Sequence, residues 1–103
     1  MRSIENYITL LENGISIKLC ANEYNYHDLK EVAESLPQSD QKLLELELIE
    51  MPVFEMRRII DLFPDNNTFL KITPAPDISV LELIEMKQDN IQYDFTITLE
   101  DED

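Results

Sequence analysis

Residues 44–64 read LELELIEMPVFEMRRIIDLFP, and this stretch decides the fold. In residues 44–48 leucine alternates with glutamate, which is typical of a strand with one buried face. Pro52 suits the first turn of a helix, and Pro64 ends it. Between the two prolines the apolar residues follow a helical spacing, at Val53, Met56, Ile59, Ile60 and Phe63. The segment therefore predicts a β-strand followed by an α-helix.

The same organisation occurs 27 residues earlier in the chain. Ile15, Ile17 and Leu19 alternate with polar residues, and residues 26–36 form a helical pattern that Asn25 can cap and Pro37 ends. The apolar stripe of this helix is Leu29, Val32, Ala33 and Leu36. The two segments align strand to strand and proline to proline.

The spacing of 27 and the sequence Ile17-x-Leu19-x-x-Asn22-x-Tyr24 resemble leucine-rich repeats of the ribonuclease-inhibitor type. Leu43-x-x-Leu46-x-Leu48 fits the same motif, and the resemblance covers about half the chain. Met51 occupies the asparagine position in the second unit. Two units are fewer than the roughly three that a solenoid needs. We therefore interpret them as two successive strand–helix units and do not assign the chain to that family.

The remaining segments are predicted as strands. Asn13-Gly14 is typical of a two-residue hairpin turn, which predicts a β-hairpin over residues 7–19. Strands are also predicted over residues 68–73, 78–86 and 91–99, with a polar loop at 38–40 and a frayed acidic end at 100–103. The expected order is ββαβαβββ within one domain, residues 1–103. The fold class is α/β, bordering on α+β: a two-layer sandwich with a mixed sheet of about six strands and two helices on one face.

Both helices are expected on the same face, because consecutive crossovers between parallel strands share one hand. The other face of the sheet would then be open, and the alternation in the strands supports this. The predicted helix-side core comprises both helix stripes with Ile15, Ile17, Leu19, Leu44, Leu46, Leu48, Leu70, Ile72, Tyr93, Phe95 and Ile97. The predicted open face carries Ser16, Lys18, Cys20, Glu45, Glu47, Ile49, Phe69, Lys71, Thr73, Asp94, Thr96 and Thr98.

Composition limits the partners of the protein. The 103 residues include 22 acidic and 8 basic ones, for a formal charge of −14. Direct binding to nucleic acid or to an anionic membrane is disfavoured, since both depend on Lys and Arg. A partner protein with a basic surface would be attracted, although the acidity can equally serve solubility alone. The single cysteine and the lack of an apolar run of membrane-spanning length favour the cytoplasm.

Few residues offer catalytic chemistry. His27 and Glu31 are spaced i, i+4 and are a conceivable metal pair, but zinc needs three or four ligands. Cys20 and His27 are a conceivable nucleophile–base pair. The single glycine excludes Gly-rich phosphate loops. We expect no cofactor, no metal site and no catalytic residue.

The leading hypothesis is a non-catalytic protein-binding module, such as an inhibitor, an immunity protein or a chaperone. Its binding residues would be Lys18, Glu45, Glu47, Ile49, Phe69, Lys71, Asp94 and Thr96 on the open face. One alternative is a nucleic-acid mimic that inhibits a DNA-binding protein or nuclease, because carboxylates two residues apart on a strand approach the phosphate spacing. Another is a small enzyme using Cys20 and His27. A homodimer through the sheet face or a sheet edge also remains open.

Overall fold

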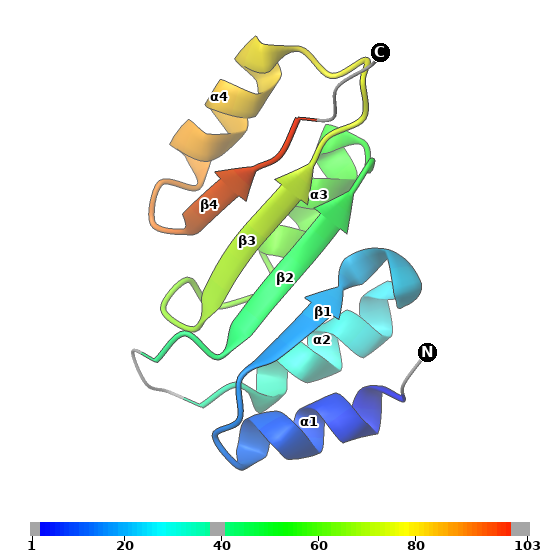
Figure 1. Ribbon diagram of the computed structural model, residues 1–103, viewed down its shortest axis with the longest axis vertical. Helices are drawn as coiled ribbons and strands as arrows, with labels where there is room; N and C mark the ends of the chain where they lie inside the picture. The colour runs from blue at the N-terminus through cyan, green and yellow to red at the C-terminus, as the bar shows by residue number, and fades with distance from the viewer. Residues whose placement is uncertain (1–2, 38–40, 100–103) are drawn as a thin grey trace.

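A computed structural model describes residues 3–37 and 41–99, and it shows four parallel strands with helices on one side (Figure 1). The loop expected at 38–40 and the acidic end expected at 100–103 lie outside the described residues. The elements are α1 (Ile4–Glu12), β1 (Ile17–Cys20), a 3-10 turn (Ala21–Glu23), α2 (Tyr26–Ser35), β2 (Leu44–Ile49), α3 (Val53–Ile60), β3 (Thr68–Thr73), α4 (Val80–Asp89) and β4 (Asp94–Ile97). The α/β class is confirmed.

The strands stand in sequence order, β1-β2-β3-β4, and every neighbouring pair is parallel. Partner residues lie 27 positions apart between β1 and β2 (Ile17 and Leu44), 24 between β2 and β3 (Leu44 and Thr68) and 25 between β3 and β4 (Phe69 and Asp94). The described chain therefore holds three strand–helix units and a closing strand. The expectation of only two such units was wrong, and so was the mixed sheet of about six strands.

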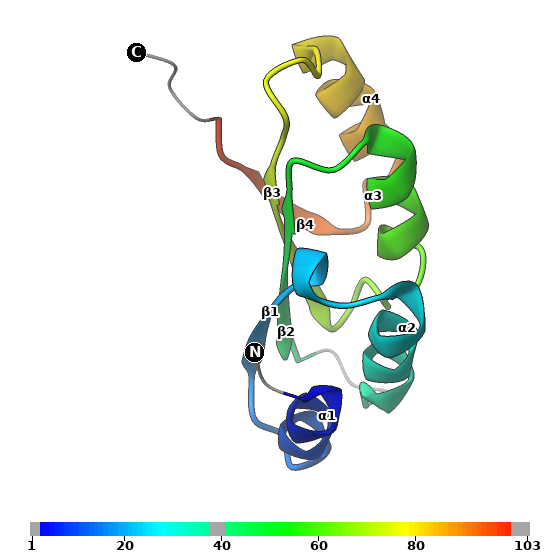
Figure 2. The ribbon, with the colours of Figure 1, turned by 90° about the vertical axis from the view of Figure 1, so that its right-hand side faces the viewer.

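All the helices lie on the same side of the sheet, as the edge-on view shows (Figure 2). The prediction that the first two crossover helices shelter one face is confirmed, and α4 joins them there. Their stripes are buried, including Leu29 and Val32 on α2 and Met56 and Ile60 on α3. The opposite face of the sheet carries no described helix.

The predicted N-terminal hairpin is wrong, because residues 4–12 form α1 and Asn13-Gly14 ends it. Gly14 has φ +74°, a conformation that glycine adopts without steric cost. Its N–H donates to the carbonyl of Leu11 (3.0 Å), and the N–H of Ile15 donates to that of Leu10 (2.9 Å). These two bonds form a Schellman motif, which satisfies the last carbonyls of the helix. The same dipeptide thus terminates a helix instead of turning a hairpin.

The strand predicted over residues 78–86 is also wrong, because Val80–Asp89 is a helix. The Oγ of Ser79 accepts the backbone N–H of Glu82 (3.2 Å), and the Glu82 carboxylate accepts the backbone N–H of Ser79 (3.5 Å). This reciprocal pair is a capping box. Leu83 and Met86 are buried, three residues apart as on one helix face.

The core forms a single layer between the helices and the sheet. Most of the predicted core residues are buried, among them Leu19, Leu46, Leu70 and Ile72. Ile15 is an exception, with 49% of its surface exposed, because it belongs to the turn after α1 and not to a strand. Residues Ile17, Phe95 and Ile97, in the two outer strands, are half-buried against this core.

Tyr93, the residue before β4, links that strand to the end of α3 through its side chain. Its buried hydroxyl lies within hydrogen-bond distance of the carbonyls of Ile60 (3.0 Å) and Phe63. Burial raises the pKa of Tyr93 above its usual 10.0, and the charges of Asp65 and Asp61 raise it further. The phenol is therefore held neutral in the folded chain beyond the pH at which it ionises in the unfolded chain.

We expect Tyr93→Phe to destabilise the chain by about 1–3 kcal/mol at pH 7, because the carbonyl of Phe63 loses its donor and that of Ile60 keeps only the N–H of Phe63. A raised folded pKa contributes stability that is complete below the unfolded pKa and is lost as the pH rises through the folded pKa. The difference in the free energy of unfolding between wild type and Tyr93→Phe should therefore become smaller above about pH 10. Urea unfolding from pH 7 to pH 11 measures this free energy for both proteins. Tyr26→Phe, on an exposed ring, is the control, and a pH-independent difference would contradict the assignment.

Candidate functional site

The candidate site is the side of the sheet opposite the helices, called here the sheet face. Its described strand residues are Lys18, Cys20, Glu45, Glu47, Ile49, Phe69, Lys71, Thr73, Asp94 and Thr96. Along β2 and β3 the residues alternate strictly between buried and half-buried positions. The half-buried set points to the sheet face, because successive side chains of a strand point to opposite sides.

The strand register arranges these side chains in rows. One row runs Lys18, Glu45, Phe69 and Asp94 across the four strands, and the next runs Cys20, Glu47, Lys71 and Thr96. A third row pairs Ile49 with Thr73. The structure thus brings together all eight residues that the sequence predicted for partner binding.

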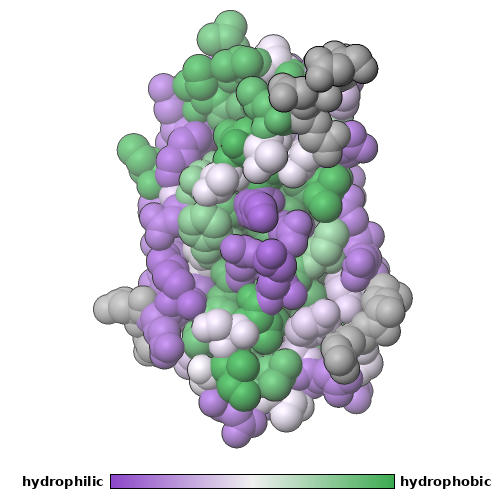
Figure 3. Space-filling model, in the orientation of Figure 1, coloured by the Kyte–Doolittle hydropathy of each residue, from purple (hydrophilic) through white to green (hydrophobic). Residues whose placement is uncertain are grey.

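Charges of opposite sign are neighbours on the sheet face. The Nζ of Lys18 lies 3.2 Å from the Oε2 of Glu45, and the register places Lys71 beside Glu47. The Nζ of Lys42 lies 3.4 Å from the Oδ2 of Asp94. The space-filling view shows hydrophilic side chains gathered over the middle of this face, with hydrophobic areas on either side (Figure 3).

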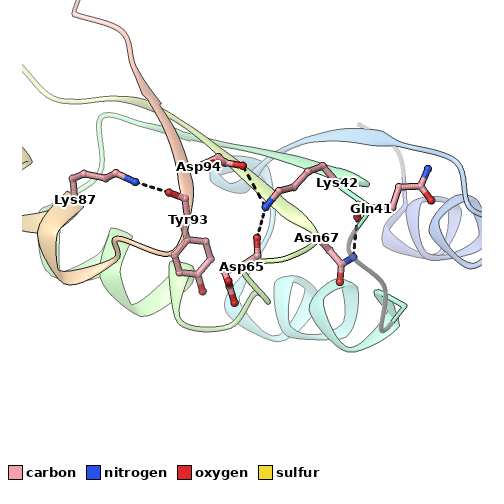
Figure 4. A network of polar contacts seen from close by, with 7 residues as sticks. All are labelled: Gln41, Lys42, Asp65, Asn67, Lys87, Tyr93 and Asp94. Atoms are coloured by element: carbon pink, nitrogen blue, oxygen red, sulfur yellow. Dashed lines mark hydrogen bonds and ion pairs between the residues drawn. The ribbon is translucent and has the colours of Figure 1, made fainter.

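Lys42 is a residue of this site that the sequence analysis missed. It reaches from the start of β2 across to Asp94, and it also donates to the carbonyl of Asp65 at 2.6 Å (Figure 4). Nearby, the side chain of Asn67 donates to the carbonyl of Gln41 (2.8 Å), which joins the segments before β2 and β3. Lys42 precedes the alternating residues of its strand, so no periodic signal marks it.

Three lysines, Lys18, Lys42 and Lys71, therefore lie on or beside the sheet face together with three carboxylates, Glu45, Glu47 and Asp94. The face is close to neutral, whereas the whole chain has a charge of −14. Among the described residues, most of the acidic excess consequently lies away from this face.

The side chain of Asn22 holds the C-terminal end of β2 at Ile49. Its side-chain oxygen accepts the N–H of Ile49 (2.9 Å), and its amide donates to the carbonyl of the same residue (2.6 Å). These two hydrogen bonds link the turn after β1 to the end of β2, 27 residues further along the chain. It is the structural role of the asparagine in the repeat-like motif.

The residues considered for catalysis are not assembled. The Sγ of Cys20 lies 3.8 Å from the Oδ1 of Asn22 on the sheet face, whereas His27 is exposed on α2 and its Nε2 lies 3.0 Å from the Oε1 of Glu31. The part of the chain that the structure describes holds no group of three or more His, Cys, Asp or Glu side chains suited to a metal ion. Within the same residues, no helix has the length and apolar character to cross a membrane.

Comparison with known proteins gave no match to a family model, a curated protein or a solved structure.

Asn22→Ala should destabilise the chain by about 1–3 kcal/mol, because the N–H and carbonyl of Ile49 both lose their partner. Hydrogen exchange should show the Ile49 amide losing protection more than the amides of β3. Asn6→Ala, at an exposed position on α1, is the control. Unchanged protection at Ile49 would show that the two hydrogen bonds of Asn22 do not hold this end of β2.

Proposed function

We propose that the chain is a non-catalytic module that binds another protein through the sheet face. One observation supports this most directly: four in-register strands present a whole face that no described element covers (Figure 2). Such a face offers a broad surface of fixed spacing, about 4.8 Å from strand to strand. It is suited to docking a protein surface.

The side chains on this face have the character of an interface. Ile49 and Phe69 are half-buried and provide apolar contact, and aromatic residues are enriched at the energetic centres of interfaces. The charged neighbours of Phe69 in its row, Glu45 and Asp94, are each paired with a lysine. Paired charges around an apolar centre select the orientation of a partner more than they add affinity.

The partner we propose is a protein with a basic surface. The charge of −14 attracts it from a distance, and the rate of association should fall as salt is added. The lysines on the sheet face call for some acidic groups on the part of the partner that docks there. Inhibitor, immunity and chaperone roles all fit this description, and the free thiol of Cys20 suits a reducing cytoplasm.

The alternative of a nucleic-acid mimic is less well supported by the geometry. A mimic needs an unbroken row of negative charge, whereas here lysines lie beside Glu45, Glu47 and Asp94. An enzyme using Cys20 and His27 is less well supported too, because each of these residues contacts a different neighbour.

The test is capture of a protein from a host lysate by the immobilised chain, followed by affinity measurement for that protein. Phe69→Ala and Lys71→Ala should each weaken binding, Phe69→Ala by about tenfold or more if it lies at the centre of the contact. Phe54→Ala is the matched control, because Phe54 is 75% exposed on α3, on the helix side.

Thermal unfolding of the three variants would confirm that they fold. Equal binding by Phe69→Ala, Lys71→Ala and wild type would remove the sheet face as the site. Displacement of the chain from its partner by DNA would instead support the mimic.

A further inference from the structure

The exposed apolar side chains of the molecule gather around α4 and β4. Eight large hydrophobic residues are exposed among those described, and five of them lie in or beside these two elements: Val80, Leu81, Ile84, Ile91 and Leu99. Single exposed hydrophobic residues are ordinary on a protein surface, whereas a contiguous group of them marks a contact surface.

Three of the five share a groove. Its apolar lining is formed by Val80, Leu83, Ile84, Ile97 and Leu99. On α4 the lining residues are spaced i, i+3 and i+4, so they form one stripe along the helix. α4 lies beyond β4 in Figure 1, and hydrophobic surface over it is visible from the side of the sheet face (Figure 3).

The groove itself is almost uncharged. Among the described residues its one charged lining residue is Lys87, which donates to the carbonyl of Tyr93 and whose Nζ lies 4.9 Å from the ring centre of Phe95. With its ammonium group engaged in this way, the aliphatic stem of Lys87 serves as apolar lining. A surface of this kind takes apolar side chains, because a charge placed on it would lose its hydration.

Carboxylates stand beside the groove on α4. Glu82 and Glu85 are both exposed, and Glu85 lies one helical turn after Leu81. The chain as a whole has a charge of −14. The favoured occupant therefore combines an apolar side, for the groove, with Lys or Arg residues beside it, for the carboxylates.

A second copy of the chain fits this requirement poorly. Its own α4 carries the same carboxylates, and two bodies with a charge of −14 repel each other. An extended segment is disfavoured as well, because α4 occupies the side of β4 on which a further strand would be added (Figure 1). An amphipathic helix meets both conditions, since its apolar residues lie on one side and its charged residues on the other.

We propose that the groove receives an amphipathic helix of a partner protein, with the apolar side against Val80, Ile84 and Leu99 and with Lys or Arg side chains near Glu85. The choice of a basic protein rests on the proposed function, but the groove is a different surface from the sheet face. From Val80 to Lys87 the stripe rises about 10 Å along α4, which matches about two turns of a bound helix.

The probe for the first test is a synthetic peptide of about 14 residues, or four helical turns, with Leu at i, i+3, i+4 and i+7 and Lys elsewhere. Its affinity is measured by fluorescence anisotropy. Ile84→Gln should weaken binding at least about tenfold, because a polar amide enters the apolar contact. Phe54→Gln, at a residue of α3 that is 75% exposed, should bind like wild type. Equal binding by Ile84→Gln and wild type would overturn the proposal.

Two further peptides separate shape from charge. A peptide of the same composition, ordered so that its leucines no longer share one side, should bind at least about tenfold more weakly, and so should a peptide with Glu in place of Lys. Added salt should weaken binding of the first peptide. Equal binding of the reordered peptide would show that charge alone drives the association, which would contradict a helix in the groove.

The state of the chain without peptide tests the other occupant. A dimer in analytical ultracentrifugation that Ile84→Gln dissociates would overturn the proposal, because a second copy would then fill the groove. Phe69→Ala, on the sheet face, should bind the peptide like wild type. Failure at the groove and failure of the proposed function are therefore distinguishable, since the sheet-face variants and the groove variant affect different contacts.

Discussion

Neighbouring strands pack closer together than neighbouring helices can. This difference in spacing determines how the helix layer covers the sheet. Neighbouring strands lie about 4.8 Å apart, whereas packed helices require about 8–10 Å. Each crossover returns through a helix on the same side of the sheet (Figure 2), so the helix layer is wider than the sheet it covers. The helices therefore fill one side completely, and the described chain has no element left to cover the other.

The distribution of charge follows the same division. Carboxylates are spread over the helices, for example Asp28 and Glu31 on α2 and Glu82 and Glu85 on α4. The sheet face instead pairs lysines with carboxylates. The unpaired carboxylates and the paired charges of the described residues thus belong to different surfaces, which the composition alone could not reveal.

Sequence reasoning succeeded where the two faces of an element differ in polarity. Leu44–Ile49 was recognisable because buried leucine alternates with half-exposed glutamate, and α2 and α3 because each has a clear stripe. Their placement on one face followed from the hand of parallel crossovers. From these the sheet face and its eight predicted residues could be derived before any coordinates.

Sequence reasoning failed where one local sequence signal is compatible with two different structures. Asn13-Gly14 fits both a hairpin turn and a helix end, since both use the left-handed conformation of glycine. The choice depends on what precedes it, and the bonds of Gly14 and Ile15 to α1 decide it. Lys42 was missed for another reason: its contact with Asp94 joins segments whose proximity only the register of three strands establishes.

The strand predicted where α4 lies has a different cause. A helix is recognised by the contrast between a buried apolar side and an exposed polar side. On α4 that contrast is weak, because Val80, Leu81 and Ile84 are exposed while Leu83 and Met86 are buried. The local capping signal, Ser79 with Glu82, was present in the sequence all the same. The weak contrast hid the helix, and only the cap formed by Ser79 and Glu82 could have revealed it from the sequence.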